Sequence, residues 1–182
     1  LLTDAFPIPF HATRPEHVGP GIRSALADAQ SEVDAVAADP APPTWQNTVE
    51  RMDRAVELLA RRIAPASHLV AVAETPELRE AYNAVLPDMS AFWSRLPLDE
   101  RLWARVRAFK DTDEAQGLTG LRRRHLDKTV QEFRRAGADL PADSKVRLEA
   151  LKVELAQLQQ RFAENVLDAT AAYELLVTDE CR

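Results

Sequence analysis

Apolar side chains recur every three or four residues along most of this chain, which is the spacing of a helix face that packs against a core. The first stripe predicts a helix from about Pro20 to Ala38, with these inward positions: Val18, Ile22, Leu26, Ala29, Val33 and Val36. Thr44 is a suitable N-cap for a second helix that begins at Trp45. Pro65 lies inside that second pattern and predicts a kink, because its ring removes a hydrogen bond and crowds the preceding turn.

The middle of the chain predicts two more helices and a loop. Thr75–Pro76 gives a cap followed by proline at the first helical position, which is a typical helix start. We expect this third helix to bend at Pro87 and to bury one stripe: Leu78, Tyr82, Val85, Leu86, Met89, Phe92 and Trp93. A short helix over residues 98–109 follows, and residues 111–120 are expected to form a loop.

Two further helices complete the pattern. The fifth spans about 121–136, with Leu126, Val130 and Phe133 inward and Gly137 as its C-terminal cap. The sixth runs from Pro141 to about residue 170, and its apolar stripe is Leu148, Leu151, Leu155, Leu158, Phe162 and Val166. The connection between them is short, which favours antiparallel packing of one helix against the other.

The two ends of the chain differ from this helical pattern. The two prolines between Phe6 and Phe10 predict an extended arm whose aromatic rings attach it to the core. Tyr173–Thr178 is apolar and partly β-branched, which is typical of a strand. The fold class is therefore predicted as all-α, a multi-helix bundle with bent helices plus a short β-like segment at the C-terminal end. We interpret residues 1–170 as one helical domain and 171–182 as the truncated start of the next unit.

Composition narrows the class of protein. Apolar residues make up 46% of the chain and there are 5 glycines, which suits a globular helical protein. The net charge of -6 gives no overall attraction to nucleic acid. The single cysteine excludes an internal disulfide framework and fits a reducing compartment. The sequence has neither a signal peptide pattern nor an apolar run long enough to span a bilayer, so we expect no membrane partner.

One stretch departs from the overall acidity. Residues 101–135 contain five acidic and ten basic residues: Arg101, Arg105, Arg107, Lys110, Arg122, Arg123, Arg124, Lys128, Arg134 and Arg135. Such a stretch either binds peptide carboxylates or nucleic acid, or it forms a helix pair that faces its own acidic neighbours. The second interpretation is favoured, because no aromatic residues alternate with the basic ones to stack on bases.

No catalytic or metal-binding residue is predicted within the chain. The four histidines, His11, His17, His68 and His125, are not spaced three or four residues from one another or from the cysteine, so they offer no zinc pattern. The glycines are too scattered for a phosphate-binding loop. Cys181 lies near the end of the sequence without a neighbouring base, which argues against a catalytic thiol.

Several short motifs, taken together in their order, resemble one known family. They are Phe-Pro-Ile-Pro-Phe at 6–10, Arg-Pro-Glu-His-Val at 14–18, Thr-Trp-Gln-Asn-Thr at 44–48, Pro-Ala-Ser-His-Leu at 65–69, Thr-Pro-Glu-Leu-Arg-Glu-Ala-Tyr-Asn at 75–83, Glu-Asn-Val-Leu-Asp-Ala-Thr at 164–170 and Val-Thr-Asp-Glu at 177–180. Nearly the whole chain resembles the N-terminal region of the thimet oligopeptidase and peptidyl-dipeptidase family of zinc metallopeptidases.

The resemblance implies a function for a larger parent protein. In this family the N-terminal helices form one wall of a deep channel that admits short peptides, and zinc sits on an H-E-x-x-H helix far downstream. This sequence contains no H-E-x-x-H. The hypothesis is therefore a substrate-gating N-terminal domain of a cytoplasmic zinc oligopeptidase. Zinc, the catalytic residues and the catalytic domain with which this segment pairs would lie elsewhere, and the segment alone would not be an enzyme.

Two further expectations complete this hypothesis. Arg122, Arg123 and Arg124 are candidate residues for binding the carboxylates of short peptides, and no nucleic-acid partner is expected. The alternative function is a free-standing, non-catalytic helical interaction protein, a truncated peptidase paralogue that uses the same surface to bind a partner.

Overall fold

The computed structural model describes residues 8, 10–73 and 75–175, and every regular element within these residues is a helix. The chain divides into two compact units, residues 1–139 and 140–182, which are described separately. The first unit holds the following elements: η1 (Phe10–Ala12), α1 (Pro15–Ala38), η2 (Trp45–Glu50), α2 (Arg51–Val72), α3 (Pro76–Asn83), α4 (Leu86–Arg95), η3 (Leu96–Leu98), α5 (Glu100–Lys110), α6 (Asp113–Gln116) and α7 (Gly120–Ala136). The predicted all-α class is thus confirmed for the described residues.

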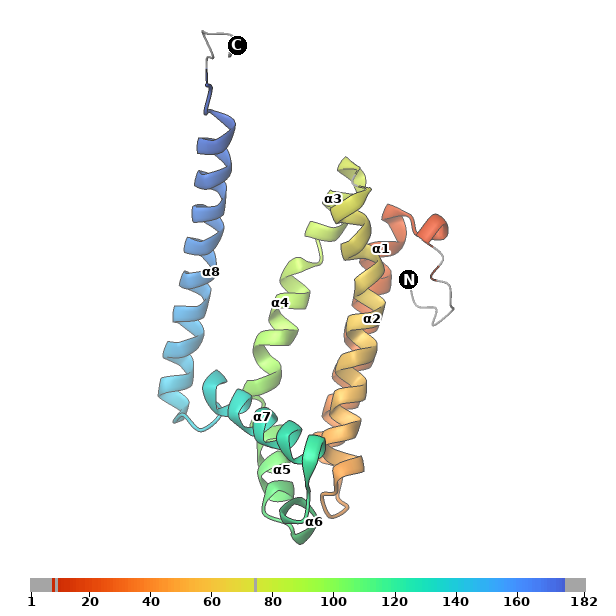
Figure 1. The fold of residues 1–182 in the computed structure, drawn as a ribbon, viewed down its shortest axis with the longest axis vertical. Helices are drawn as coiled ribbons and strands as arrows, with labels where there is room; N and C mark the ends of the chain where they lie inside the picture. The colour runs from red at the N-terminus through yellow and green to blue at the C-terminus, as the bar shows by residue number, and fades with distance from the viewer. Residues whose placement is uncertain (1–7, 9, 74, 176–182) are drawn as a thin grey trace, which may run out of the picture. The chain divides into compact units, whose positions relative to one another are not determined.

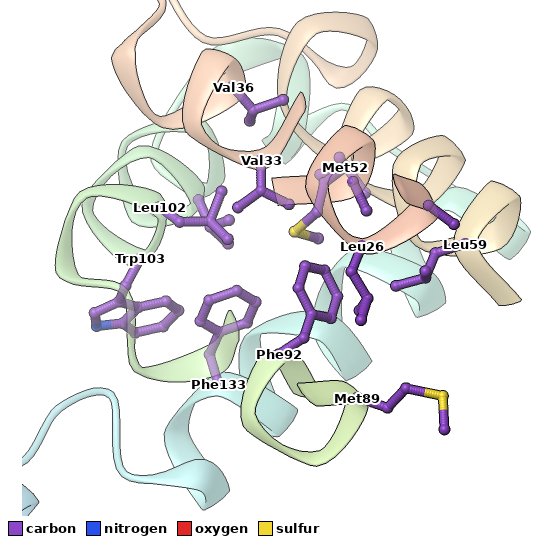
Figure 2. Close-up of a cluster of buried hydrophobic side chains, with 14 of the residues drawn as sticks. Leu26, Val33, Val36, Met52, Leu59, Met89, Phe92, Leu102, Trp103 and Phe133 are labelled. Atoms are coloured by element: carbon purple, nitrogen blue, oxygen red, sulfur yellow. The ribbon is translucent and has the colours of Figure 1, made fainter. Parts of the chain in front are cut away.

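The core of the first unit forms around α1. This helix packs along α2 and also contacts α3, α4 and α5, while α5 in turn contacts α7 (Figure 1). All six predicted inward positions of α1 are buried, and so are Leu126, Val130 and Phe133 of α7. Figure 2 shows side chains from several helices meeting in one cluster. Each large apolar side chain removed from water in this way contributes about 1.5–3 kcal/mol to stability.

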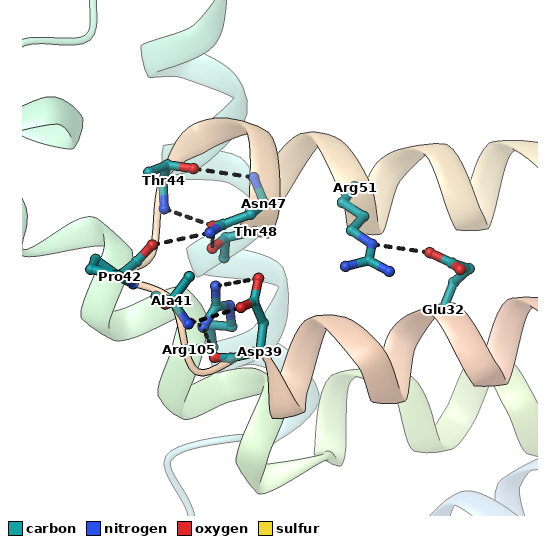
Figure 3. Close-up of polar contacts among 9 residues, drawn as sticks. All are labelled: Glu32, Asp39, Ala41, Pro42, Thr44, Asn47, Thr48, Arg51 and Arg105. Carbon is teal, nitrogen blue, oxygen red and sulfur yellow. Dashed lines mark hydrogen bonds and ion pairs between the residues drawn. The ribbon is translucent and has the colours of Figure 1, made fainter.

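The connection between α1 and α2 is held by polar contacts (Figure 3). The predicted N-cap is confirmed, because the Thr44 hydroxyl accepts a hydrogen bond from the Asn47 N–H at 3.2 Å. The Asn47 side chain returns the bond by accepting from the Thr44 N–H at 2.8 Å. The first turns after this cap, Trp45–Glu50, form a π-helix, which is a rare geometry that often lies at functional sites.

Two predicted boundaries were wrong because prolines acted differently from expectation. The first helix begins at Pro15 and not near Pro20, because proline suits the first helical position and the Arg14 N–H donates to His17 Nδ1 at 3.3 Å. Pro87 does more than bend the third helix. The pattern separates into α3 and α4, since proline cannot donate to the carbonyl four residues earlier. After this break Leu86 and Trp93 are exposed, although the continuous stripe had placed both inward.

The predicted kink at Pro65 does not interrupt α2, which is helical from Arg51 to Val72. His68, on the turn after Pro65, faces the N-terminal arm: its ring lies 5.5 Å from that of Phe10. The described part of the arm forms a short 3₁₀ turn at Phe10–Ala12 instead of an extended path. Residues 1–7 and 9, which carry the rest of that prediction, lie outside the described residues.

Two other predictions, the cap at Gly137 and the helix over residues 98–109, are confirmed. Gly137 caps α7 with a φ of 105°, a left-handed conformation that glycine adopts without steric cost. Its N–H donates to Arg134 O, and the Ala138 N–H donates to Phe133 O, as in a Schellman motif. The predicted helix at 98–109 corresponds to α5, and the loop expected at 111–120 includes the four-residue helix α6.

The second unit contains one long helix, α8 (Ala142–Ala171), close to the predicted limits. Five residues of its predicted apolar stripe are 47–70% exposed: Leu151, Leu155, Leu158, Phe162 and Val166. The strand predicted for residues 173–178 is not seen, because 173–175 form no regular structure and 176–182 lie outside the described residues. Nothing within the described part of the second unit covers the stripe of α8.

Replacing Asp99 with alanine should lower the free energy of unfolding by about 1 kcal/mol at neutral pH, because its carboxylate caps α5. Burial acts to raise the pKa of Asp99, but hydrogen bonds from Leu102 and Arg101 outweigh burial and hold the pKa below its ordinary 3.8. A depressed folded-state pKa stabilises the fold above the unfolded value, and this contribution is lost as the pH falls through the folded value.

Urea unfolding at neutral pH and well below pH 3.8 checks this prediction. The difference between the parent and Asp99→Ala should shrink at the lower pH. Asp99→Asn is the control, because asparagine keeps a capping oxygen and should cost little at neutral pH. An equal loss for Asp99→Ala at both pH values would contradict the capping argument.

Candidate functional site

The basic residues of α5 and α7 separate into paired and unpaired groups. Among the described residues, four of the ten form ion pairs with carboxylates of the same unit: Arg101 with Asp34 at 2.7 Å, Arg105 with Asp39 at 3.2 Å, Arg123 with Asp127 at 3.1 Å and Arg134 with Asp139 at 3.1 Å. For these four residues the favoured interpretation, basic helices facing their own acidic neighbours, holds. Two of the acidic partners lie on α1 or at its end, so these pairs also fix α5 against the core.

Several of the remaining basic residues gather along the first half of α7. They line a surface recess of about 430 Å³, here called the α7 recess, formed by Leu121, Arg122, Arg124, His125 and Lys128. Leu121, His125 and Lys128 stand four and three residues apart, so they stack on one face of the helix. Within the described part of the chain, neither Arg124 nor Lys128 has a carboxylate partner. The recess therefore keeps a positive charge that the first unit does not neutralise.

Two residues of the recess, Arg122 and His125, pack against the side chain of Trp45. Its ring is only 8% exposed, and the Arg122 guanidinium lies over it at 5.4 Å from the ring centre. The His125 ring approaches the same indole edge-on at 5.9 Å, and Phe109 approaches it at 6.5 Å. The Trp45 backbone N–H donates to Glu114 Oε1 at 3.1 Å. A cation held over an aromatic face in this way is attracted by about 0.5–1 kcal/mol at an exposed site.

His125 also ties α7 to α2. Its Nε2 lies 2.5 Å from Asp53 Oδ2. Burial raises the pKa of the Asp53 carboxyl above its ordinary 3.8, and contact with His125 acts in the opposite direction. The nearby Glu132 and Glu50 raise the Asp53 pKa further. The pair thus holds His125 at the edge of the recess, and its carboxylate is already engaged.

Arg122, Arg123 and Arg124, which were predicted from the sequence to bind peptide carboxylates, do not lie on one surface of α7. Successive helical residues are rotated by about 100°, so three neighbours cannot share a face. Arg122 and Arg124 line the α7 recess, whereas Arg123 is held by Asp127 and also reaches Ala115 O at 3.5 Å. Of the three predicted residues, only the first and third therefore line the recess, and they leave the helix roughly 160° apart around its axis.

Sequence reasoning missed three members of the site. Lys128 and His125 could have been found from the helical spacing that begins at Leu121, since they fall on the same face. Trp45 could not, because it is 77 positions before Arg122 and meets it only in the folded chain. The recess has the chemistry of an anion-binding surface, since guanidinium and ammonium groups donate charge-assisted hydrogen bonds to carboxylates.

The described residues do not fit a zinc site. No three His, Cys, Asp or Glu side chains among them converge as metal ligands would. Three of the histidines contact different residues: His17 contacts Arg14, His68 contacts Phe10 and His125 contacts Asp53. Within the same described residues, no helix is both long and apolar enough to cross a membrane.

Comparison with known proteins gives a consistent result. Residues 22–145 match the family described as neurolysin/thimet oligopeptidase, N-terminal domain. The chain is 36% identical over 180 residues to oligopeptidase A of Salmonella typhimurium, covering 99% of this chain and 26% of that protein. It is 31% identical to the probable cytosolic oligopeptidase A of Arabidopsis thaliana, covering 94% of this chain and 24% of the relative. It is 28% identical to the dipeptidyl carboxypeptidase of Salmonella typhimurium, covering 98% of this chain and 27% of that protein.

Proposed function

Because this chain belongs to the neurolysin/thimet oligopeptidase family, with an N-terminal domain of the oligopeptidase A type, we propose that it is the substrate-gating helical part of a zinc oligopeptidase that hydrolyses short peptides. The observation that carries the proposal is the family match over residues 22–145. The chain spans about a quarter of the length of the oligopeptidase A relatives. The chemistry would therefore be performed by a portion of a longer protein outside this sequence.

The gating role follows from steric exclusion. The helices of the first unit pack through one continuous core, so they can form a rigid wall. A rigid wall beside a catalytic centre admits an extended short peptide and excludes a folded protein, whose surface cannot enter. In this arrangement residues 1–170 would be the N-terminal helical domain, and residues 171–182 would begin the next unit.

Zinc would be held in the remaining portion, where it supplies Lewis-acid activation of water for attack on the peptide carbonyl. The residues described here would orient the peptide. Arg122 and Arg124 are the proposed contacts among the three arginines of the candidate site, because both line the α7 recess. Arg123 would contribute less, since its guanidinium is paired with Asp127.

The exposed stripe of α8 suggests where the catalytic portion packs. Exposure of five large apolar side chains on one helix to water is unfavourable. The described part of the first unit offers only scattered exposed apolar residues, such as Val72 and Trp93, on separate elements. The relatives are about four times as long as this chain, which leaves ample sequence to cover the stripe. We assign this surface to the catalytic portion of the same protein.

A cytoplasmic location is part of the proposal. The single cysteine suits a reducing compartment. One relative is described as a probable cytosolic enzyme and another, also from Arabidopsis thaliana, as chloroplastic/mitochondrial. Fractionation of source cells distinguishes the two.

The test uses the native gene product. We expect a protein several times longer than 182 residues that hydrolyses a short internally quenched peptide, loses this activity with a zinc chelator and regains it when Zn²⁺ is restored. The same cleavage sequence placed inside a folded protein should be resistant, because the wall excludes it. Cleavage of the folded substrate at a similar rate would reject the gating role.

A native product close to 182 residues long, without peptidase activity, would reject the proposal as a whole. It would favour the alternative of a free-standing helical interaction protein, because α8 would then present its apolar stripe to a separate partner.

A further inference from the structure

The α7 recess is lined by three basic side chains, Arg122, Arg124 and Lys128, for which the described residues give no ion pair with a carboxylate. Arg101, Arg105 and Arg134 are each ion-paired within the unit. Two carboxylates near the recess are already in use: Asp53 contacts His125, and Glu50 pairs with Arg54 at 3.5 Å. Glu132 also lies close to Asp53, four residues after Lys128, and the described residues give no ion pair between it and a cation of the recess. An anion that enters the recess would therefore meet cations that need not first break an ion pair.

The recess is also partly preorganised. Arg122 is held over Trp45, and Trp45 is held by its contacts with Phe109, His125 and Glu114. Ordering a long side chain before binding reduces the entropy lost on binding. Leu121, 86% exposed at the end of the recess, adds an apolar surface beside the charges. A peptide side chain or backbone can lie against this leucine while a carboxylate reaches the cations.

The geometry favours an acidic peptide over a nucleic acid. Single-stranded nucleic acid binds through aromatic faces on which bases stack. Two aromatic rings adjoin the recess in the described residues, and neither offers a free face: Trp45 is buried and covered by Arg122, and His125 packs against Trp45 and contacts Asp53. A volume of about 430 Å³ is large enough for one or two side chains but not for a folded partner.

We propose that the α7 recess binds the carboxylates of acidic peptides, so that a peptidase containing this chain prefers substrates rich in Asp or Glu. The inference rests on the proposed function for its biological meaning, but binding itself can be measured without hydrolysis. Arg124 and Lys128 would contact the carboxylate directly, and Arg122 would contact it from its position on Trp45. These residues determine specificity and take no part in bond cleavage.

The experiment compares two labelled peptides that differ only in carrying Glu or Gln, with the intact native protein. Fluorescence anisotropy gives the Kd of each for the parent and for Arg124→Glu. We expect the Glu peptide to bind the variant roughly tenfold more weakly, as for the loss of one charge-assisted hydrogen bond at an exposed site. The Gln peptide should bind parent and variant alike.

Arg135→Glu is the matched control. It makes the same charge change on the exposed surface of α7, about 17 Å further along the helix axis. Its Kd for the Glu peptide should equal that of the parent. Equal weakening by both variants would overturn the inference, because a general field and not the recess would then attract the peptide. Equal affinity of the parent for the Glu and Gln peptides would overturn it as well.

Two further measurements separate the possible failures. Displacement of the Glu peptide by a single-stranded oligonucleotide at lower concentration than by unlabelled peptide would reject an acidic peptide as the natural occupant. Hydrolysis is followed in parallel with the same substrates. Selective binding of the Glu peptide without hydrolysis would reject the peptidase function and leave the recess as a binding site.

Discussion

Replacing Arg105 with alanine is expected to lower the free energy of unfolding by about 3 kcal/mol, because it leaves the partly buried carboxylate of Asp39 without its cation. Arg105 is 8% exposed on α5, and its Nη2 lies 3.2 Å from Asp39 Oδ2 (Figure 3). Its Nη1 also donates to the backbone carbonyls of Asp39 at 2.6 Å and Ala41 at 3.2 Å. One guanidinium thus holds the whole turn that follows α1.

The size of this loss depends on what remains after the substitution. The Asp39 side chain is 18% exposed, and among the described residues it would keep only the hydrogen bond from the Ala41 N–H at 2.9 Å. Removing one partner of a buried pair costs about 3–5 kcal/mol. We expect the lower end for two reasons. Asp39 is only partly buried, and the buried Nε and Nη2 of Arg105 have no hydrogen-bond partner among the described residues, so the contact of Nη2 with Asp39 is an ion pair alone.

Urea unfolding measures the effect, and Arg101→Ala is the matched control. Arg101 lies one turn earlier on α5 and pairs with Asp34, but its side chain is 61% exposed. Exposed ion pairs contribute about 0.2–1 kcal/mol, so the control should lose far less. The double variant Arg105→Ala with Asp39→Asn should recover part of the loss, because it removes the stranded charge. Equal losses for the two single variants would contradict the importance of burial.

The second large effect concerns the stripe of α8. Replacing Leu155 and Leu158 with aspartate should destabilise the full-length native protein by several kcal/mol. Each buried leucine contributes about 1.5–3 kcal/mol, and burial of a carboxylate adds a further cost. In the 182-residue chain on its own the same change should lower the stability by only about 1 kcal/mol, because both side chains are more than half exposed and the main loss is the lower helix propensity of aspartate.

Thermal unfolding of both proteins, with and without the substitutions, tests this prediction. Ala150→Asp is the control, because Ala150 is exposed on the same helix and lies about 120° around the axis from the centre of the apolar stripe. It should affect both proteins equally, through helix propensity alone. If the leucine substitutions destabilise the 182-residue chain as strongly as the longer protein, the stripe packs within this chain. That outcome would favour the antiparallel packing against residues 121–136 that the sequence predicts.

The candidate site was only partly accessible to sequence reasoning. The excess of basic residues over 101–135 is a property of composition and can be counted. Which of these residues are neutralised depends on carboxylates brought from far along the chain, as for Arg101 and Asp34, 67 positions apart. The prediction from the sequence gave Arg122, Arg123 and Arg124 the same role, but in a helix the three side chains point in different directions. Only folding assigns Arg123 to Asp127 and Arg122 to Trp45.

What the sequence determined by itself is local. Helix type, the cap at Thr44, the left-handed turn at Gly137 and the buried faces of α1 and α7 follow from periodicity and from backbone preferences that act within a few residues. Tertiary structure decided the rest. It determined that Trp93 is exposed and that Trp45, Asp53 and α7 meet. These outcomes depend on which apolar side chains and charged groups from distant parts of the chain come into contact in the folded protein. No pattern within a few residues contains that information.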